Sequence, residues 1–144
     1  MGSLYVYNQN QIRMMFKLLR DLDIYTNERV IKKLAKLVKE DVDSFTRDFA
    51  LDLSQKDYSY NKFEVLKLSN SDKRKLDNNK LYRYEYRKKS NLRTLFVVIN
   101  DNNSVLVLEA FNENENKSNG KDSYDKAIKN AIYNYLDIKE EIDE

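Results

Sequence analysis

The sequence predicts one α+β domain made of N-terminal helices, a twisted antiparallel sheet and a C-terminal helix, with the helices packed on one face of the sheet. Apolar residues recur at helical spacing in residues 4–61, alternate with polar ones in residues 62–111, and return to helical spacing in residues 112–144 after a polar loop. A chain of 144 residues can bury one core, and no internal repeat is visible, so residues 1–144 are expected to form a single domain.

The first part of the chain is expected to be helical. Residues 1–3 resemble a remnant of a cloning vector and are given no structural role. Residues 4–7 (LYVY) fit either a short strand or the lead-in to a helix. A first helix is predicted from Gln9 onward by apolar residues at helical spacing. These residues are Ile12, Met15, Phe16, Leu19 and Leu22.

A second helix is predicted after Thr26 or Asn27, either of which can cap its N-terminus. Its apolar face consists of Val30, Ile31, Leu34, Leu37 and Val38. A third helical pattern follows, made by Val42, Phe45, Phe49 and Leu53. This pattern either continues the second helix or begins a new helix after a bend.

The apolar period then changes to two, which is typical of strands. Phe63, Val65 and Leu68 indicate a short strand, and the polar residues 69–80 are expected to form a loop. Three further strands are predicted, joined by the turns "KKSN" and "NDNN". They cover residues 81–87, 93–99 and 104–111. Together these strands form an antiparallel meander.

The chain is expected to end in a helix. A polar loop, "NENENKSNGKDS", covers residues 112–123, and Asp122 or Ser123 can cap the helix that follows. The apolar stripe of that helix consists of Tyr124, Ala127, Ile128, Ala131, Ile132 and Tyr135. The last residues, "DIKEEIDE", extend or fray it.

The composition excludes several kinds of chemistry. The chain has no cysteine, which rules out disulfides and thiolate metal sites, and no histidine, the usual acid-base side chain near neutral pH. The acidic stretches lack the spacing of a calcium loop, and glycine-rich phosphate motifs are missing, so neither a metal nor a cofactor is expected. No apolar run is long enough to span a membrane, and no signal peptide is visible. A cytoplasmic protein of bacterial or phage origin is expected.

Charge is distributed unevenly along the chain. Residues 62–100 carry 11 cations and 4 anions, whereas residues 101–144 carry 5 cations and 11 anions. The basic middle favours a polyanion as partner.

Much of the basic charge lies in "YRYEYRKKSNLRTLFVV", residues 82–98. Arg83 and Arg87 share one face of a predicted strand, while Lys88, Lys89 and Arg93 cluster at the turn and in the next strand. Such an array can bind nucleic-acid phosphates. The alternating tyrosines either stack on unpaired bases or face the helices as part of the core, and the second interpretation is favoured.

One reaction class needs neither histidine nor a metal. RNA can be cleaved by its own 2′-hydroxyl if that group is deprotonated, the charge on the phosphorus is stabilised and the leaving oxygen is protonated. Crowded Lys, Arg and Tyr side chains can share these roles, and the basic middle of this chain contains them.

The order of motifs from Phe63 to Leu136 resembles the RelE/ParE superfamily of bacterial toxins, most closely its HigB-like branch, which includes phage-derived members. The matching stretches are "VLKLS" (65–69), "LYRYEYR" (81–87), "LRTLFVV" (92–98), "VLVLEAF" (105–111), "NENENKSNGKDS" (112–123) and "YDKAIKNAIYNYL" (124–136). The resemblance implies two N-terminal helices on a twisted antiparallel sheet and a C-terminal helix.

The resemblance also implies a function and site residues. Many members of this superfamily cut mRNA in the ribosomal A site and are neutralised by a small antitoxin protein. By position, Arg87 and Arg93 match arginines near the scissile phosphate, Lys67 and Lys117 match lysines, and the C-terminal tyrosine corresponds to either Tyr124 or Tyr135. The expected function is a toxin-like, metal-independent endoribonuclease with RNA or the ribosome and a cognate antitoxin as partners.

The chain also departs from the family pattern. Asn112, Glu113 and Asn114 replace family lysines, and an anion beside the phosphate opposes stabilisation of the transition state. Glu113 can instead act as a general base. The departure also leaves open a second hypothesis: a non-catalytic binding module on the same scaffold, such as a phage-encoded modulator that binds a host protein or nucleic acid.

Overall fold

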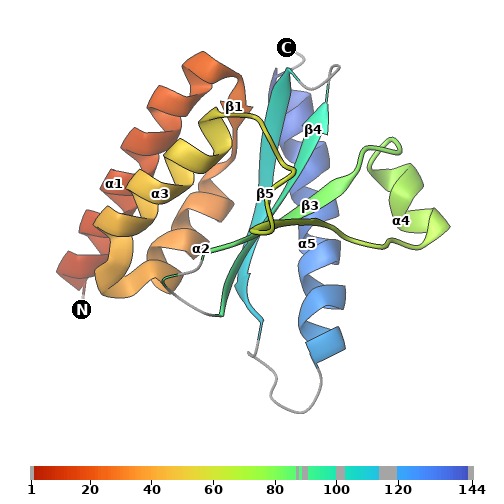
Figure 1. The fold of residues 1–144 in the computed structure, drawn as a ribbon. Helices are drawn as coiled ribbons and strands as arrows, with labels where there is room; N and C mark the ends of the chain where they lie inside the picture. The colour runs from red at the N-terminus through yellow and green to blue at the C-terminus, as the bar shows by residue number, and fades with distance from the viewer. Residues whose placement is uncertain (1, 87, 89–90, 100–102, 114–119, 143–144) are drawn as a thin grey trace.

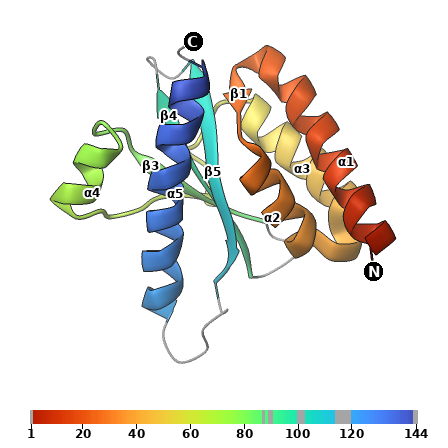
Figure 2. The same ribbon diagram turned by 180° about the vertical axis from the view of Figure 1, so that it is seen from behind.

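A five-stranded mixed sheet lies between two helical layers in the computed structural model (Figure 1). The structure describes residues 2–86, 88, 91–99, 103–113 and 120–142. Three N-terminal helices cover one face of the sheet, and the C-terminal helix runs along the other, as the view from behind also shows (Figure 2). The fold is therefore α+β.

The described elements follow one another as helices, strands and a final helix. The helices are α1 (Gly2–Leu19), α2 (Glu28–Val38), α3 (Val42–Ser54), α4 (Asn70–Lys75) and α5 (Gly120–Ile142), with 3₁₀ turns at Arg20–Leu22 and Lys39–Asp41. The strands are β1 (Ile24–Tyr25), β2 (Phe63–Val65), β3 (Leu81–Glu85), β4 (Leu92–Ile99) and β5 (Ser104–Asn112). Their order is β1-β5-β4-β3-β2; β1 is parallel to β5 and the other pairs are antiparallel.

The N-terminal helices form much as their apolar spacing predicts, but their limits differ. Helix α1 begins at Gly2, so residues 4–7 lead into the helix rather than forming a strand, and the helix starts earlier than Gln9. Asn27 caps α2, since its Oδ1 accepts a hydrogen bond from the amide of Val30 at 3.1 Å. Lys39 has a φ of 50°, which ends α2, and α3 is a separate helix.

The alternating tyrosines of β3 belong to the core, as the favoured interpretation predicts. Tyr84 and Tyr86 are almost fully buried and pack edge-on against Phe49 and Phe45 of α3, with ring centroids 5.4 Å and 5.3 Å apart. Tyr82 stacks on Phe96 of β4. The aromatic side of the hairpin is therefore unavailable for stacking on bases.

The prediction that all helices lie on one face of the sheet is wrong. Both faces of β4 and β5 are buried because α5 covers the face opposite α1 to α3. The segments "LFVV" and "VLVL" are apolar at consecutive positions, a pattern expected of strands covered on both sides. Nor is the sheet purely antiparallel, because β1 adds a short parallel pair to β5.

Two shorter segments also differ from expectation. The predicted loop 69–80 contains α4, whose N-terminus is capped by Ser69 Oγ accepting from the amide of Asp72 at 3.1 Å. This helix buries none of its residues, so it leaves no apolar period in the sequence. Helix α5 begins at Gly120, before the predicted caps at Asp122 and Ser123.

The outer edge of β5 is closed by side chains along most of its length. Strand β1 pairs only with Val105 and Leu106. Beyond this pair, Thr26 Oγ1 donates to the carbonyl of Val107, and Asn134 Nδ2 to the carbonyl of Leu108, both at 2.8 Å. These bonds satisfy backbone groups that an open strand edge leaves unpaired.

A β-bulge in β5 places Glu109 at the same edge. The pairing with β4 shifts between Leu95 and Phe96, which makes Leu108 the extra residue. The Glu109 carboxylate is almost fully buried and accepts from Lys33 Nζ of α2 and Asn130 Nδ2 of α5, each at 2.9 Å. Glu109, Lys33 and Asn130, here called the edge lock, thus join the two helical layers across the sheet edge.

Candidate active site

A cluster of charged side chains lies at one end of the sheet, on the face that α5 covers. Alternation along β3 and β4 points Arg83 and Arg93 to the same side as the core residues Leu81 and Leu95. Glu113 follows directly after β5, and Tyr124 lies near the start of α5. Three strands and a helix therefore bring these side chains together.

A chain of hydrogen bonds links the four residues. Glu113 Oε2 lies 3.0 Å from Arg93 Nη2, and Glu113 Oε1 accepts from the Tyr124 hydroxyl at 2.5 Å. The same hydroxyl accepts from Arg83 Nη1 at 3.0 Å. We call Arg83, Arg93, Glu113 and Tyr124 the sheet-end cluster.

Two more carboxylates surround the arginines. Arg83 Nη2 lies 2.5 Å from Glu64 Oε2, and Glu85 lies 3.8 Å from Arg83 and 4.0 Å from Arg93. The side chain of Arg93 is only 7% exposed, whereas that of Glu64 is 59% exposed. The exposed Glu64 pair is weak and easily exchanged, while the pair of Arg93 with Glu113 is protected from water.

The environment keeps Tyr124 protonated at neutral pH. Burial raises the pKa of Tyr124, and the hydrogen bond to Glu113 raises it further, although the hydrogen bond from Arg83 acts in the opposite direction. A neutral phenol beside a carboxylate and two guanidinium groups is a proton donor rather than a base.

The structure gathers part of the set predicted from the sequence. Arg83, Arg93 and Tyr124 meet in the sheet-end cluster, and Glu113, considered above as a general base, lies at its centre. The predicted site residues Arg87, Lys89 and Lys117 lie outside the described residues.

The remaining predicted residues lie elsewhere. Lys67 follows β2 and lines a separate cavity of about 580 Å³ beside α4. Tyr135 is buried about 16 Å further along α5 than Tyr124 and donates a hydrogen bond to Asp77 at 2.7 Å. Lys88 pairs with Asp48 of α3 at 3.3 Å. Of the two tyrosines predicted as alternatives, Tyr124 is the one beside the arginines.

Sequence reasoning missed Glu64 and Glu85. Both follow from strand register, since Glu64 is the partner of Arg83 across β2 and β3, and Glu85 is the partner of Arg93 across β3 and β4. Opposite charges in cross-strand positions are a recognisable signal once the register is known.

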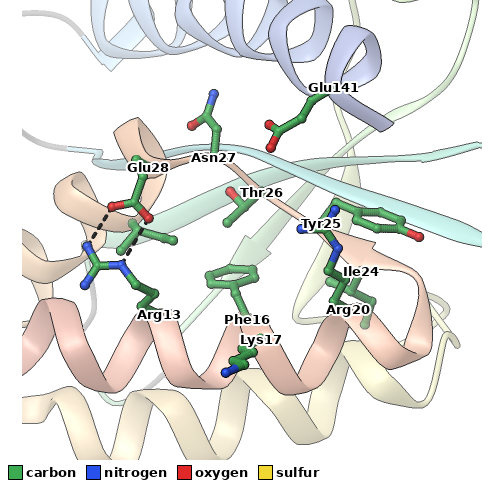
Figure 3. Close-up of a pocket in the computed structure, with 11 residues that line it drawn as sticks. Arg13, Phe16, Lys17, Arg20, Ile24, Tyr25, Thr26, Asn27, Glu28 and Glu141 are labelled. Atoms are coloured by element: carbon green, nitrogen blue, oxygen red, sulfur yellow. Dashed lines mark hydrogen bonds and ion pairs between the residues drawn. The ribbon is translucent and has the colours of Figure 1, made fainter. Parts of the chain in front are cut away.

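A different cavity, of about 310 Å³, opens between α1, the start of α2 and the C-terminal end of α5 (Figure 3). Arg13 is turned to Glu28 and bonded to both of its carboxylate oxygens, at 2.6 Å and 3.1 Å. Arg20 lies over the ring of Tyr25, and Glu141 approaches from α5. This cavity contains none of the predicted site residues.

Among the residues that the structure describes, no three Asp or Glu side chains lie close enough together to hold a metal ion. Nor does any helix in the described part combine the length and apolar composition that crossing a bilayer requires.

Comparison with models of known protein families, with curated proteins and with solved structures found no match to this chain.

Proposed function

We propose that this protein is a toxin-like endoribonuclease of the RelE/ParE type that cuts mRNA in the bacterial cytoplasm and is neutralised by an antitoxin. The observation that carries the proposal is the position of Glu113, whose two carboxylate oxygens are bonded to Arg93 and to Tyr124. A carboxylate, a phenol and two guanidinium groups are thus linked by successive hydrogen bonds in a chain without histidine, which supports acid-base chemistry at this cluster.

Each member of the sheet-end cluster has a role in this reaction. Glu113 accepts the proton of the RNA 2′-hydroxyl, and the 2′-oxygen attacks the adjacent phosphorus. Arg83 and Arg93 stabilise the additional negative charge on the phosphate oxygens. The bond from phosphorus to the 5′-oxygen breaks, and Tyr124 donates its proton to that oxygen. The products are a 2′,3′-cyclic phosphate and a free 5′-hydroxyl.

Induced expression in a bacterial host tests the proposal. We expect wild type to arrest growth and deplete mRNA, while Glu113→Gln, which removes the base but preserves the shape, loses activity by about a hundredfold or more. Arg93→Ala is expected to relieve the arrest as well. Arg47→Ala, which breaks an exposed ion pair with Asp48, is the matched control and remains toxic. A harmless wild-type protein that leaves ribosome-bound RNA intact rules out the nuclease.

A second candidate is the non-catalytic binding module. It is favoured by the pairing of both arginines with carboxylates, Arg83 with Glu64 and Arg93 with Glu113, because a phosphate must compete with these partners. Capture of a stoichiometric host protein by the purified chain, with no RNA cleavage by wild type, would support this module over the nuclease.

A further inference from the structure

The exposed face of α2 carries a row of cations. Its apolar residues face the core, and the opposite side presents basic residues at helical spacing. These are Arg29, Lys32, Lys33 and Lys36, and all four line one groove of about 490 Å³. Helix α5 forms the other wall with Asn130, Tyr133 and Asn134, and Glu109 lies at the bottom.

The positive charge of this groove is only partly neutralised. Lys33 is bound by Glu109, and Arg29 forms an exposed ion pair with Asp137 at 3.2 Å. Within the described ranges, Lys32 and Lys36 make no ion pair with a carboxylate. Cations that line a concave surface without matching anions attract a polyanion.

An exposed aromatic ring adjoins these cations. Tyr133 is 63% exposed, and the Arg29 guanidinium carbon lies 4.7 Å from the centre of its ring. Arg29 is itself held by Asn134, whose Oδ1 accepts from Arg29 Nε at 3.0 Å. The wall of the groove therefore presents a stacking surface beside fixed positive charge.

We propose that this groove binds single-stranded nucleic acid, with phosphates on Arg29, Lys32 and Lys36 and a base stacked on Tyr133. Cations in a groove together with an exposed ring are the features that hold unpaired strands. The two helices present these cations and the ring along the two walls of one groove. The bound base and phosphates contact α2 and α5, apart from the sheet-end cluster.

That the natural strand is RNA rests on the proposed function. The attraction of phosphates by the cations of α2 does not depend on it. Glu109 at the bottom of the groove and Glu113 in the sheet-end cluster lie four residues apart in sequence. At the spacing of an extended chain this separation is about 13 Å. A strand held in the groove can therefore continue to Glu113.

Fluorescence anisotropy with labelled RNA and DNA strands of about 12 nucleotides tests this binding. The RNA arm uses Glu113→Gln as the parent protein, so that cleavage does not interfere. Lys32→Glu with Lys36→Glu is expected to weaken binding of both strands by more than about tenfold at about 0.1 M salt, where the Debye length is about 10 Å. Tyr133→Ala is expected to weaken it by at least about fivefold, and Tyr133→Phe to leave it unchanged.

The matched control reverses the same number of charges on another exposed helix. Lys73→Glu with Lys75→Glu, on α4, is expected to bind both strands within about twofold of the parent, because surface charges beyond a Debye length are screened. The neutral pair Lys32→Gln with Lys36→Gln should reduce the slope of log affinity against log salt by about 1.4.

Three results would overturn the proposal: equal loss in the α4 control, full binding by the α2 charge-reversal variant, or a preference for duplex over single strands. The proposal of the nucleic-acid groove and the proposal of the nuclease can be refuted independently. Cleavage by wild type with normal binding by the α2 variant refutes the groove alone. Loss of binding in that variant, with no cleavage by wild type, refutes the nuclease alone.

Discussion

Replacing Lys33 by methionine measures how much the edge lock contributes to the free energy of unfolding. The side chain of Glu109 is 3% exposed, so after Lys33→Met its carboxylate stays largely buried at the bottom of the groove. It keeps two hydrogen bonds, from Asn130 Nδ2 at 2.9 Å and from the amide of Ala110 at 3.1 Å. Removing one partner of a buried ion pair costs about 3 to 5 kcal/mol, and the two remaining bonds and the open groove beside Glu109 place this case at the lower end, near 3 kcal/mol.

Urea unfolding at neutral pH measures this cost. With a slope of about 2 kcal/mol per molar urea, the loss corresponds to a fall in the unfolding midpoint of about 1.5 M. The double variant Lys33→Met with Glu109→Met removes both charges and is expected to recover most of the loss, ending within about 1 kcal/mol of wild type. Lys32→Met, at the exposed neighbouring position, is the control and should change stability by no more than about 0.5 kcal/mol.

Two outcomes contradict the reasoning. If Lys33→Met costs less than about 1 kcal/mol, the carboxylate is reached by water and the lock is a surface ion pair. If the double variant is as unstable as the single one, the loss comes from packing of the lysine stem rather than from a buried unpaired charge.

Three further changes test individual contacts. Tyr58→Phe should stabilise the fold by about 1 kcal/mol in urea unfolding, because the buried Tyr58 hydroxyl has no hydrogen-bond partner among the described residues. Asn27→Ala should cost about 1 kcal/mol or more in thermal unfolding through the lost α2 cap and the lost hydrogen bond to Asp137, and Asn27→Ser, which keeps an accepting oxygen for the cap, should cost less. Burial raises the pKa of Tyr58 to about 12, and burial together with the hydrogen bond to Asp52 raises the pKa of Tyr84. The free energy of unfolding should therefore be unaffected by these groups below pH 10 and should fall as the pH rises toward 12. Tyr84→Phe should make the fall in stability at high pH smaller. Alkaline unfolding followed by tyrosinate absorbance measures this difference.

The elements of the fold that bury apolar residues could be predicted from their periodicity. Helices α2 and α3, the strands β3 to β5 and the stripe of α5 all follow from spacing alone. Helix α4 and strand β1 could not, because α4 buries nothing and β1 is two residues long. The number of covered faces was predicted wrongly because alternation was expected throughout the sheet, whereas the consecutive apolar residues of β4 and β5 indicate burial on both faces.

The candidate site was predictable only in part, because its carboxylates are placed by contacts between strands that are far apart in the sequence. Arg83 could be chosen because alternation along a strand fixes its face, and Arg93 because it matches the family pattern by position. Their carboxylate partners depend on strand register, which brings Glu64 and Glu85 opposite them and Glu113 alongside. Local sequence does not contain that register, so a basic segment in the sequence becomes a mixed-charge cluster in the fold.

Because the arginines of the sheet-end cluster already hold carboxylates, a substrate phosphate must replace a carboxylate in order to bind. Arg93 cannot meet a phosphate with the atoms that now hold Glu113, so an incoming phosphate must displace the carboxylate, and that displacement is also what frees Glu113 to act as a base. Glu113→Gln removes the competing charge and the base together. We therefore expect this variant to bind a single DNA strand, which neither protein can cleave in this way, several times more tightly than wild type binds the same strand, and to cleave RNA about a hundredfold or more slowly. Arg93→Ala should lose affinity as well as cleavage. Weaker binding by Glu113→Gln would show that the carboxylate assists the phosphate contact rather than competing with it.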